Sequence, residues 1–180
     1  MIDLDRPAEP MIGENCRAEL FEERHREALK AACAEDKDVW AIYANNFGPD
    51  GFDASIDYYR SSKRNLTFVL FDGDELAGMS SYLGIDASRQ TLEIGGTYYR
   101  PHLRGTGFNR RIKDMMLGRA FDCGFRRVEF RVDRRNARSQ AAMTKLGAVR
   151  EGVLRADRIT WNGHVRDTVL FAILKDEWPV

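Results

Sequence analysis

Residues 101–109 read Pro-His-Leu-Arg-Gly-Thr-Gly-Phe-Asn, and this glycine-bearing segment separates two strongly patterned regions. Before it, Thr91–Tyr99 has the composition of a β-strand, and after it Asn109–Cys123 carries apolar side chains at helical spacing, with Gly124 suited to end the helix. A glycine turn at a helix N-terminus leaves backbone N–H groups free beside the positive end of the helix dipole. The stretch therefore predicts a site for a phosphate-bearing ligand.

Other interpretations of the segment fit less well. A dinucleotide-binding turn would need a third glycine where Arg110 stands, and the Gly-Lys-Ser/Thr of a nucleotide P-loop is absent. We expect no metal site, because the three histidines lie far apart and no Cys/His pair has ligand spacing. By spacing alone, a simple tight bend stays open as the alternative.

Downstream of the glycine segment, the pattern again predicts short regular elements. The expected elements are a strand over Val128–Val132, a helix over Ala137–Leu146 capped by Asn136, and strands over Val149–Thr160 and Val165–Leu174. The dipeptide Asn162-Gly163 favours a type I′ turn between the last two strands.

The N-terminal half is expected to begin with an irregular lead-in over residues 1–13, followed by one domain over residues 14–180. The expected elements there are a strand in Cys16–Glu23, helices in His25–Ala34, Asp36–Tyr43 and Asp53–Ser61 with Asp53 as N-cap, and strands in Leu66–Phe71 and Leu76–Leu83. This order predicts an α/β fold with a mixed, mainly antiparallel sheet flanked by helices.

Composition narrows the class of protein. Hydrophobic residues make up 43% and charged residues 31% of the chain, which is ordinary for a globular protein. No stretch approaches the roughly 20 apolar residues of a membrane span, and the N-terminus lacks the apolar core of a secretory signal. Three widely spaced cysteines fit reduced thiols better than disulfides, so we expect a cytoplasmic location without a membrane partner.

The net charge of zero conceals two halves of opposite sign. Residues 1–99 carry 10 basic and 19 acidic side chains, whereas residues 100–180 carry 18 and 9. Either the two halves neutralise each other on folding, or the basic half binds an anionic cofactor while the acidic half attracts a cationic substrate. The zero total argues against a nucleic-acid partner.

The glycine segment and its surroundings resemble the GNAT acetyltransferase superfamily. His102-Leu103-Arg104-Gly105-Thr106-Gly107 is similar to its acyl-CoA loop, (Gln/Arg)-x-x-Gly-x-(Gly/Ala), with His102 in place of Gln or Arg. Asn136-Ala137-Arg138-Ser139 and the run from Lys145 to Gly152 resemble its second CoA-contacting helix and following strand. The residues of these motifs are most similar to those of the branch that acetylates N-terminal amines of ribosomal proteins.

The resemblance implies a splayed strand pair that holds acetyl-CoA as cosubstrate. The residues it assigns to cofactor binding are Leu103, Arg104, Gly105, Thr106, Gly107, Phe108, Asn109, Asn136 and Ser139. Backbone N–H groups from Leu103 to Phe108 are expected to face the pyrophosphate, and Arg104, Arg110 and Arg111 could add charged contacts. Asn136 could equally be a plain N-cap, and each arginine a surface residue.

For catalysis, the resemblance implies direct attack by an amine on the thioester. Glu93 is the expected general base, acting through water, and Gly95-Gly96 suits a bulge that opens the strand. The tyrosine that often serves as acid is replaced by Met143, which cannot donate a proton, so Ser139 takes that role by resemblance. The alternatives are an exposed strand position for Glu93 and a capping position for Ser139, with Tyr98 and Tyr99 as reserve acids.

We therefore expect an acetyl-CoA-dependent N-acetyltransferase whose partner is an amine acceptor, first of all a protein or peptide N-terminus. A small-molecule amine as acceptor and a non-catalytic CoA-binding module stay open as alternatives. The sequence allows a monomer or a homodimer and does not identify the acceptor.

Overall fold

The expected strand, loop and helix lie at the centre of the computed structural model, which describes residues 2–178. Strand β5 (Thr91–Tyr99) leads through the 3₁₀ turn η4 (Pro101–Leu103) into helix α3 (Phe108–Asp122). Gly107, with φ of 86°, precedes the helix, and Gly124, with φ of 93°, follows it. Both glycines take the left-handed conformation that side chains disfavour. The sequence placed this unit correctly because its boundaries are set by local glycine conformations.

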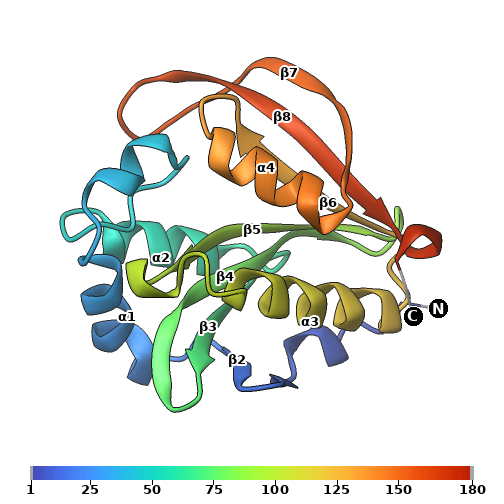
Figure 1. The fold of residues 1–180 in the computed structure, drawn as a ribbon, viewed down its shortest axis with the longest axis horizontal. Helices are drawn as coiled ribbons and strands as arrows, with labels where there is room; N and C mark the ends of the chain where they lie inside the picture. Colours follow the sequence, from blue (N-terminus) through green and yellow to red (C-terminus); the bar gives the residue numbers. More distant parts are fainter. Residues whose placement is uncertain (1, 179–180) are drawn as a thin grey trace.

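Within residues 2–178, eight strands form one sheet in the order β1-β2-β3-β4-β5-β6-β8-β7 (Figure 1). The other strands are β1 (Met11–Gly13), β2 (Cys16–Leu20), β3 (Leu66–Asp72), β4 (Glu75–Asp86), β6 (Arg127–Asp133), β7 (Val149–Ile159) and β8 (Val165–Leu174). The pairing of β5 with β6 is parallel and the others are antiparallel. A parallel neighbour needs a crossover connection, which α3 supplies. The mixed, mainly antiparallel sheet confirms the predicted fold class.

Helices cover both faces of the sheet. Helix α3 and helix α4 (Ala137–Leu146) pack on one face, whereas α1 (Arg26–Cys33), η3 (Asp38–Ile42) and α2 (Phe52–Ser61) belong to the core of the other. Alternation along β3 feeds both cores, since Phe68 and Leu70 lie in one and Val69 and Phe71 in the other. The remaining short turns are η1 (Arg6–Ala8), η2 (Glu23–His25) and η5 (Lys175–Glu177).

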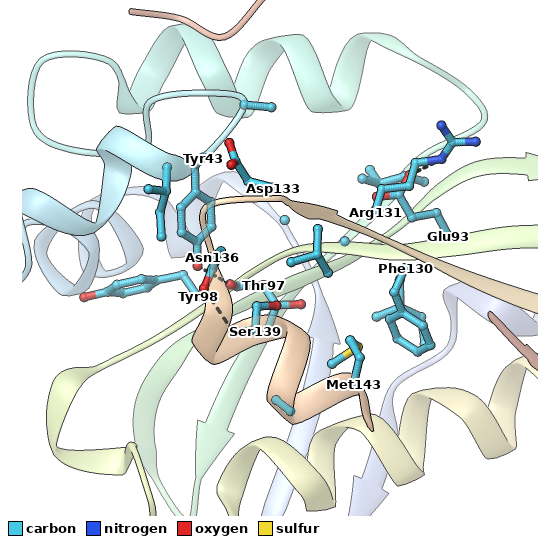
Figure 2. Close-up of a pocket in the computed structure, with 18 of the residues that line it drawn as sticks. Tyr43, Glu93, Thr97, Tyr98, Phe130, Arg131, Asp133, Asn136, Ser139 and Met143 are labelled. Carbon is cyan, nitrogen blue, oxygen red and sulfur yellow. Dashed lines mark hydrogen bonds and ion pairs between the residues drawn. The ribbon is translucent and has the colours of Figure 1, made fainter. Parts of the chain in front are cut away.

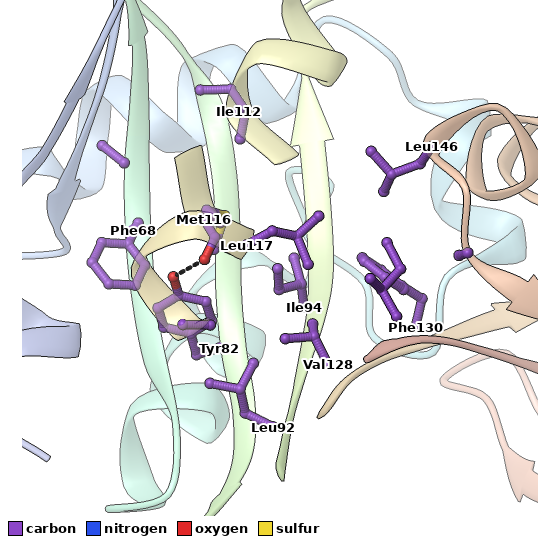
Figure 3. Packing of buried hydrophobic residues seen from close by; sticks show 14 of the residues in the cluster. Phe68, Tyr82, Leu92, Ile94, Ile112, Met116, Leu117, Val128, Phe130 and Leu146 are labelled. Atoms are coloured by element: carbon purple, nitrogen blue, oxygen red, sulfur yellow. Dashed lines mark hydrogen bonds between the residues drawn. The ribbon is translucent and has the colours of Figure 1, made fainter. Parts of the chain in front are cut away.

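The larger core is tied to α3 by packing and by one buried hydrogen bond. Tyr82 of β4 donates its hydroxyl to the carbonyl of Met116 at 2.6 Å, with Ile112 and Leu117 packed close by (Figure 3). A buried tyrosine hydroxyl left without a partner would cost about 1–3 kcal/mol. This bond therefore helps fix α3, and with it the glycine loop, against the sheet.

Three local predictions were wrong. The lead-in contains strand β1, whose Met11 is buried and pairs with Ala18; three residues are too few for a readable alternation. Helix α2 begins at Phe52 with Gly51 as N-cap, so Asp53 lies inside its first turn. In the last hairpin Gly163 has φ of 81° while Asn162 does not have positive φ, which excludes a type I′ turn. Gly163 instead donates its N–H to Thr160 at 2.9 Å.

Candidate active site

A gap opens between β5 and β6, the two parallel strands at the middle of the sheet. They pair only from Thr91 to Glu93 on β5, opposite Arg127 to Glu129 on β6. Beyond Glu93, β5 stays with β4 and β6 stays with β8, so the two strands diverge. The gap is lined by residues of β5, β6, α4 and the η3 region, and Glu93 lies at its narrow end (Figure 2).

A bulge in β5 shapes this gap. The pairing with β4 shifts register between Ser81–Gly95 and Met79–Tyr98, so Gly96 and Thr97 face one residue of β4. Gly96 has φ of 57°, and a Cβ there would lie 2.7 Å from the Tyr59 ring. No other residue type fits this conformation and space without displacement. The bulge expected at Gly95-Gly96 is therefore present.

The carboxyl group of Glu93 is buried beside basic residues. Its side chain is 19% exposed, and Arg131 Nε lies 3.6 Å from its Oε2. Burial raises the pKa of Glu93 to about 6, while Arg131, Arg158 and Arg166 oppose the rise. A carboxyl group that titrates near neutral pH can accept a proton from an ammonium group. Glu93 is thus not an exposed strand residue.

Sequence reasoning missed a second buried charge at the gap, Lys113 of α3. Lys113 is 3% exposed and lines the pocket. Its Nζ donates a hydrogen bond to Thr97 Oγ1 at 2.7 Å. Burial lowers the pKa of Lys113 to about 7, an effect that Glu93 opposes. The sequence contained a signal for this burial, because Lys113 lies among the apolar positions Ile112 and Met116 of the expected helix.

The first turn of α4 brings Asn136 and Ser139 into the same pocket. Asn136 Oδ1 accepts a hydrogen bond from the Ser139 backbone N–H at 3.0 Å, so Asn136 is the N-cap. The Ser139 hydroxyl makes no hydrogen bond to residues 2–178. Asn136 therefore carries the capping role, and the Ser139 hydroxyl remains available to a ligand.

The glycine loop offers free donors, although fewer than expected. The N–H groups of Leu103 and Arg104 are used within η4, by Arg100 and Pro101 carbonyls, and that of Phe108 lies 3.4 Å from Thr106 Oγ1. Within the described chain, four loop N–H groups have no acceptor, and these belong to Gly105, Thr106, Gly107 and Asn109. Such a set at the N-terminus of α3 fits a pyrophosphate. The side chains of Leu103 and Phe108 are buried in the core.

The arginines expected near the phosphates already have carboxylate partners. Arg104 lies 2.6 Å from Asp36, Arg110 lies 2.8 Å from Asp114, and Arg111 lies 3.1 Å from Asp72. Asp36 and Asp72 come from the acidic half of the chain, which folding brings against the basic half. Mutual neutralisation of the halves thus accounts for Arg104 and Arg111, whereas Arg110 pairs within its own helix. Their contact with the phosphates stays a prediction, and sequence spacing did not reveal the long-range partners of Arg104 and Arg111.

Two further pocket residues escaped sequence analysis. Tyr43, which precedes the loop after η3, donates its hydroxyl to the Thr97 carbonyl at 2.6 Å across the gap (Figure 2). Arg138 of α4 lines the pocket and has no carboxylate within 4.0 Å in the described chain. Only its place in the run Asn136-Ala137-Arg138-Ser139 pointed to it.

The residues that depart from the resembled pattern are placed differently. Met143 is 5% exposed and lines the pocket beside Phe130. His102 lies outside the pocket, with Nε2 3.6 Å from Glu75. Tyr98 also lines the pocket, but its hydroxyl donates to the Ala32 carbonyl at 2.9 Å in the opposite core, which removes it as a reserve acid. Tyr99 remains at the pocket wall.

The sequence profile of the acetyltransferase (GNAT) domain family matches residues 18–149. The chain belongs to the GNAT acetyltransferase family. It is an acyltransferase that uses acetyl-CoA. The strand gap and the free N–H groups of the glycine loop fit this cosubstrate. No sequence among the curated proteins matches the chain significantly.

Solved structures agree with this assignment. One described as a probable GNAT-family acetyltransferase, from Chromobacterium violaceum, is 28% identical, with a TM-score of 0.90 over 99% of this chain and 92% of its own. A GCN5-related N-acetyltransferase from Brucella melitensis is 26% identical, with a TM-score of 0.83 over 96% of this chain and 81% of its own. RimJ from Mycobacterium smegmatis, in complex with CoA-disulfide, shares the fold at 20% identity and a TM-score of 0.79, over 92% and 84%.

Two further structural observations concern membrane-spanning helices and metal sites. Among residues 2–178, no helix combines the length and the apolar composition needed to cross a membrane. The same residues contain no group of three or more His, Cys, Asp or Glu side chains arranged to hold a metal ion.

Proposed function

We propose that this GNAT protein transfers the acetyl group of acetyl-CoA to a primary amine, with a protein or peptide N-terminus as the first acceptor to test. The observation that carries the proposal is the strand gap itself. It joins a buried carboxyl group, Glu93, to a helix N-terminus with an unused hydroxyl at Ser139 and to a loop with free N–H groups.

In this proposal, the loop binds the pyrophosphate through the N–H groups of Gly105, Thr106, Gly107 and Asn109. Asn136 and Ser139 lie where the pantetheine arm would enter, and acetyl-CoA supplies the thioester. Beyond Glu93, the edge of β5 that faces β6 has no partner strand. N–H groups on that edge can therefore polarise the thioester carbonyl. Arg138, which lines the pocket and has no carboxylate partner in the described chain, is a further arginine that can contact the cofactor.

Glu93 acts as general base through water, since a pKa of about 6 leaves it ionised at neutral pH. It removes a proton from the acceptor ammonium group, and the neutral amine that remains attacks the carbonyl carbon in a ternary complex. The C–S bond of the tetrahedral intermediate then breaks, and the Ser139 hydroxyl donates a proton to the leaving thiolate while the intermediate's protonated nitrogen returns one to Ser139 and becomes the amide. Met143 cannot do so, because a thioether has no proton to give.

The proposed acceptor draws on two distant structural relatives. Ribosomal-protein-S5-alanine acetyltransferase from Vibrio fischeri has a TM-score of 0.74 at 18% identity, over 95% of this chain and 99% of its own. A spermidine N-acetyltransferase SpeG chimera from Vibrio cholerae and hSSAT has a TM-score of 0.75 at 19% identity, over 91% and 98%. Because both acceptor classes occur on this fold, a small amine remains the second candidate.

The test is release of CoA thiol from acetyl-CoA with a panel of acceptors at one pH. The panel contains N-terminal peptides, matched peptides with a blocked N-terminus, and polyamines. We expect turnover with free N-termini and none with the blocked forms. Turnover of polyamines alone would favour the second candidate, and no release above the rate of hydrolysis with any amine would contradict acetyl transfer.

A further inference from the structure

Two arginines lie directly opposite each other at the wall of the pocket. Arg158 of β7 and Arg166 of β8 are register partners in the antiparallel pair, and both line the gap that contains Glu93. Like charges directly opposite on neighbouring strands destabilise a sheet. The arrangement therefore needs a compensating group between or beside the two guanidinium groups.

The guanidinium of Arg166 has no such group within the chain. The residue is 5% exposed, and its Nη2 donates to the Arg131 carbonyl at 2.8 Å. Its Nε is buried without a hydrogen-bond partner, and no carboxylate of residues 2–178 lies within 4.0 Å of it. Burial and the charge of Arg158 lower the pKa of Arg166, while the more distant carboxylates Asp133, Glu93 and Asp157 oppose this only in part. An uncompensated buried charge is strongly unfavourable.

The nearby carboxylates are already engaged by other arginines. Asp133 is bound by Arg135 at 2.8 Å, and Asp157 by Arg158 at 3.1 Å. Glu93 lies 3.6 Å from Arg131. Each of these carboxylates thus has an arginine partner within 4.0 Å that is not Arg166, and Arg166 lies at the same end of the pocket as the group that we propose as general base.

A strained residue holds the two arginines in register. Ala156 has φ of 48°, in the left-handed region, and its N–H donates to Asp167 Oδ1 at 3.0 Å. The pairing of β7 with β8 shifts between Leu154 and Arg158 at this point. Strained residues of this kind are concentrated at ligand sites. Because of this shift, Arg158 on β7 lies opposite Arg166 on β8.

We propose that Arg158 and Arg166 bind a carboxylate of the acceptor, so that the substrate class is an amine with a carboxylate a few bonds from its nitrogen. The inference rests on the proposed function. The planar fork of arginine matches the two oxygens of a carboxylate, and the amine of the same molecule then faces Glu93. An N-terminal Asp or Glu of a peptide and a free α-amino acid both have this chemistry.

The test compares matched acceptors that differ only in the carboxylate. One pair is an N-terminal Asp peptide and its Asn counterpart, and the other is a free amino acid and its carboxamide. A charged hydrogen bond of this type gives about 10- to 100-fold in kcat/KM for the carboxylate member. The pair that shows the preference identifies the source of the carboxylate. Equal kcat/KM within both pairs would overturn the inference while leaving acetyl transfer intact.

Variants separate recognition from a structural role. Arg158 is the safer position, because its side chain is 40% exposed, whereas Arg166 is buried. Arg158→Gln should remove the preference mainly through KM, so that the two members of each pair are turned over with similar kcat/KM. Arg155→Gln, exposed on the same strand and outside the pocket, is the matched control. A loss that is equal for both acceptors would assign Arg158 a structural role instead.

A binding measurement keeps the two proposals distinct. Calorimetry with N-acetyl-Asp and N-acetyl-Asn peptides and with an N-acetyl amino acid and its carboxamide, the acetylated products of the two pairs, requires no turnover. We expect tighter binding of the carboxylate forms to the wild type and no such difference for Arg158→Gln. If no acceptor is acetylated but this difference persists, the proposed function fails and the carboxylate site stands. Equal binding of the matched products to the wild type would overturn the carboxylate site.

Discussion

The buried ammonium group of Lys113 donates a 2.7 Å hydrogen bond to Thr97, a residue of the bulge that opens β5. Thr97 in turn lies 2.7 Å from the Ser80 hydroxyl, and its carbonyl accepts the hydroxyl of Tyr43. Helix α3, strand β4 and the loop after η3 therefore all converge on one residue. This convergence fixes the bulge from three sides.

Lys113→Met should stabilise the protein more at acid than at alkaline pH. The folded-state pKa of Lys113, about 7, lies below its ordinary value of 10.5, so the unfolded chain binds more protons between these values. The unfavourable burial of the charge is complete below pH 7 and fades as pH rises toward 10.5. Denaturant unfolding at pH 6 and pH 9 should show this difference, with the exposed Lys145→Met as control. A change in unfolding free energy that is independent of pH would contradict it.

Glu93→Gln should lower kcat/KM by about 10² to 10⁴ and remove the rise in activity near pH 6. Because Glu93 raises the pKa of Lys113, that pKa should be lower in the variant. Any pH dependence of activity that Lys113 causes should therefore move to lower pH. The measurement is the pH profile of kcat/KM from pH 5 to 9. Glu151→Gln, on β7 and paired with Arg127, serves as control. An unaltered profile would exclude Glu93 as base.

The same substitution tests the burial of Glu93 through stability. Its folded pKa of about 6 exceeds the ordinary 4.5, so the folded state binds more protons in this interval, and stability falls as pH rises through it. At 1.36 kcal/mol per pKa unit, the ionised group costs about 2 kcal/mol above pH 6. Glu93→Gln should therefore gain about that much stability at pH 8 relative to pH 4. Equal unfolding free-energy changes at both pH values would show that Glu93 is not desolvated.

Ser139→Ala and Asn136→Ala should separate catalysis from helix capping. The Asn136 side chain caps α4, so its removal should cost about 1 kcal/mol in unfolding free energy. The Ser139 contribution to the cap is its backbone N–H, which alanine retains. Ser139→Ala should thus leave stability unchanged within about 0.5 kcal/mol and reduce kcat. Thermal unfolding and single-turnover assays decide the matter; full kcat in this variant would leave Ser139 without a catalytic role.

Gly96→Ala should destabilise the protein by about 2 kcal/mol, since alanine is strained at φ of 57° and its Cβ would press on Tyr59. Gly152→Ala is the matched control, because its Cβ would meet no atom within 4 Å. Denaturant unfolding of both variants measures the difference. Similar values for the two would mean that the bulge tolerates a side chain.

The sequence alone determined the features that depend on neighbouring residues. The positive φ angles at Gly107 and Gly124, the cap of Asn136 on Ser139, and the order of strands and helices after residue 13 follow from local conformation and periodicity. The loop of residues 101–109 was recognisable for the same reason. It has its special backbone wherever the rest of the chain lies.

Only the tertiary structure decided the electrostatics of the pocket. Burial of Lys113, the neutralisation of Arg104 by Asp36, and the opposition of Arg158 and Arg166 depend on strand register and on helix docking over long sequence distances. The pKa of Glu93 likewise follows from what surrounds it and not from its place on β5. Charge in a sequence is a count, whereas its energy depends on burial and on distance to other charges. Those two quantities exist only once the chain has folded.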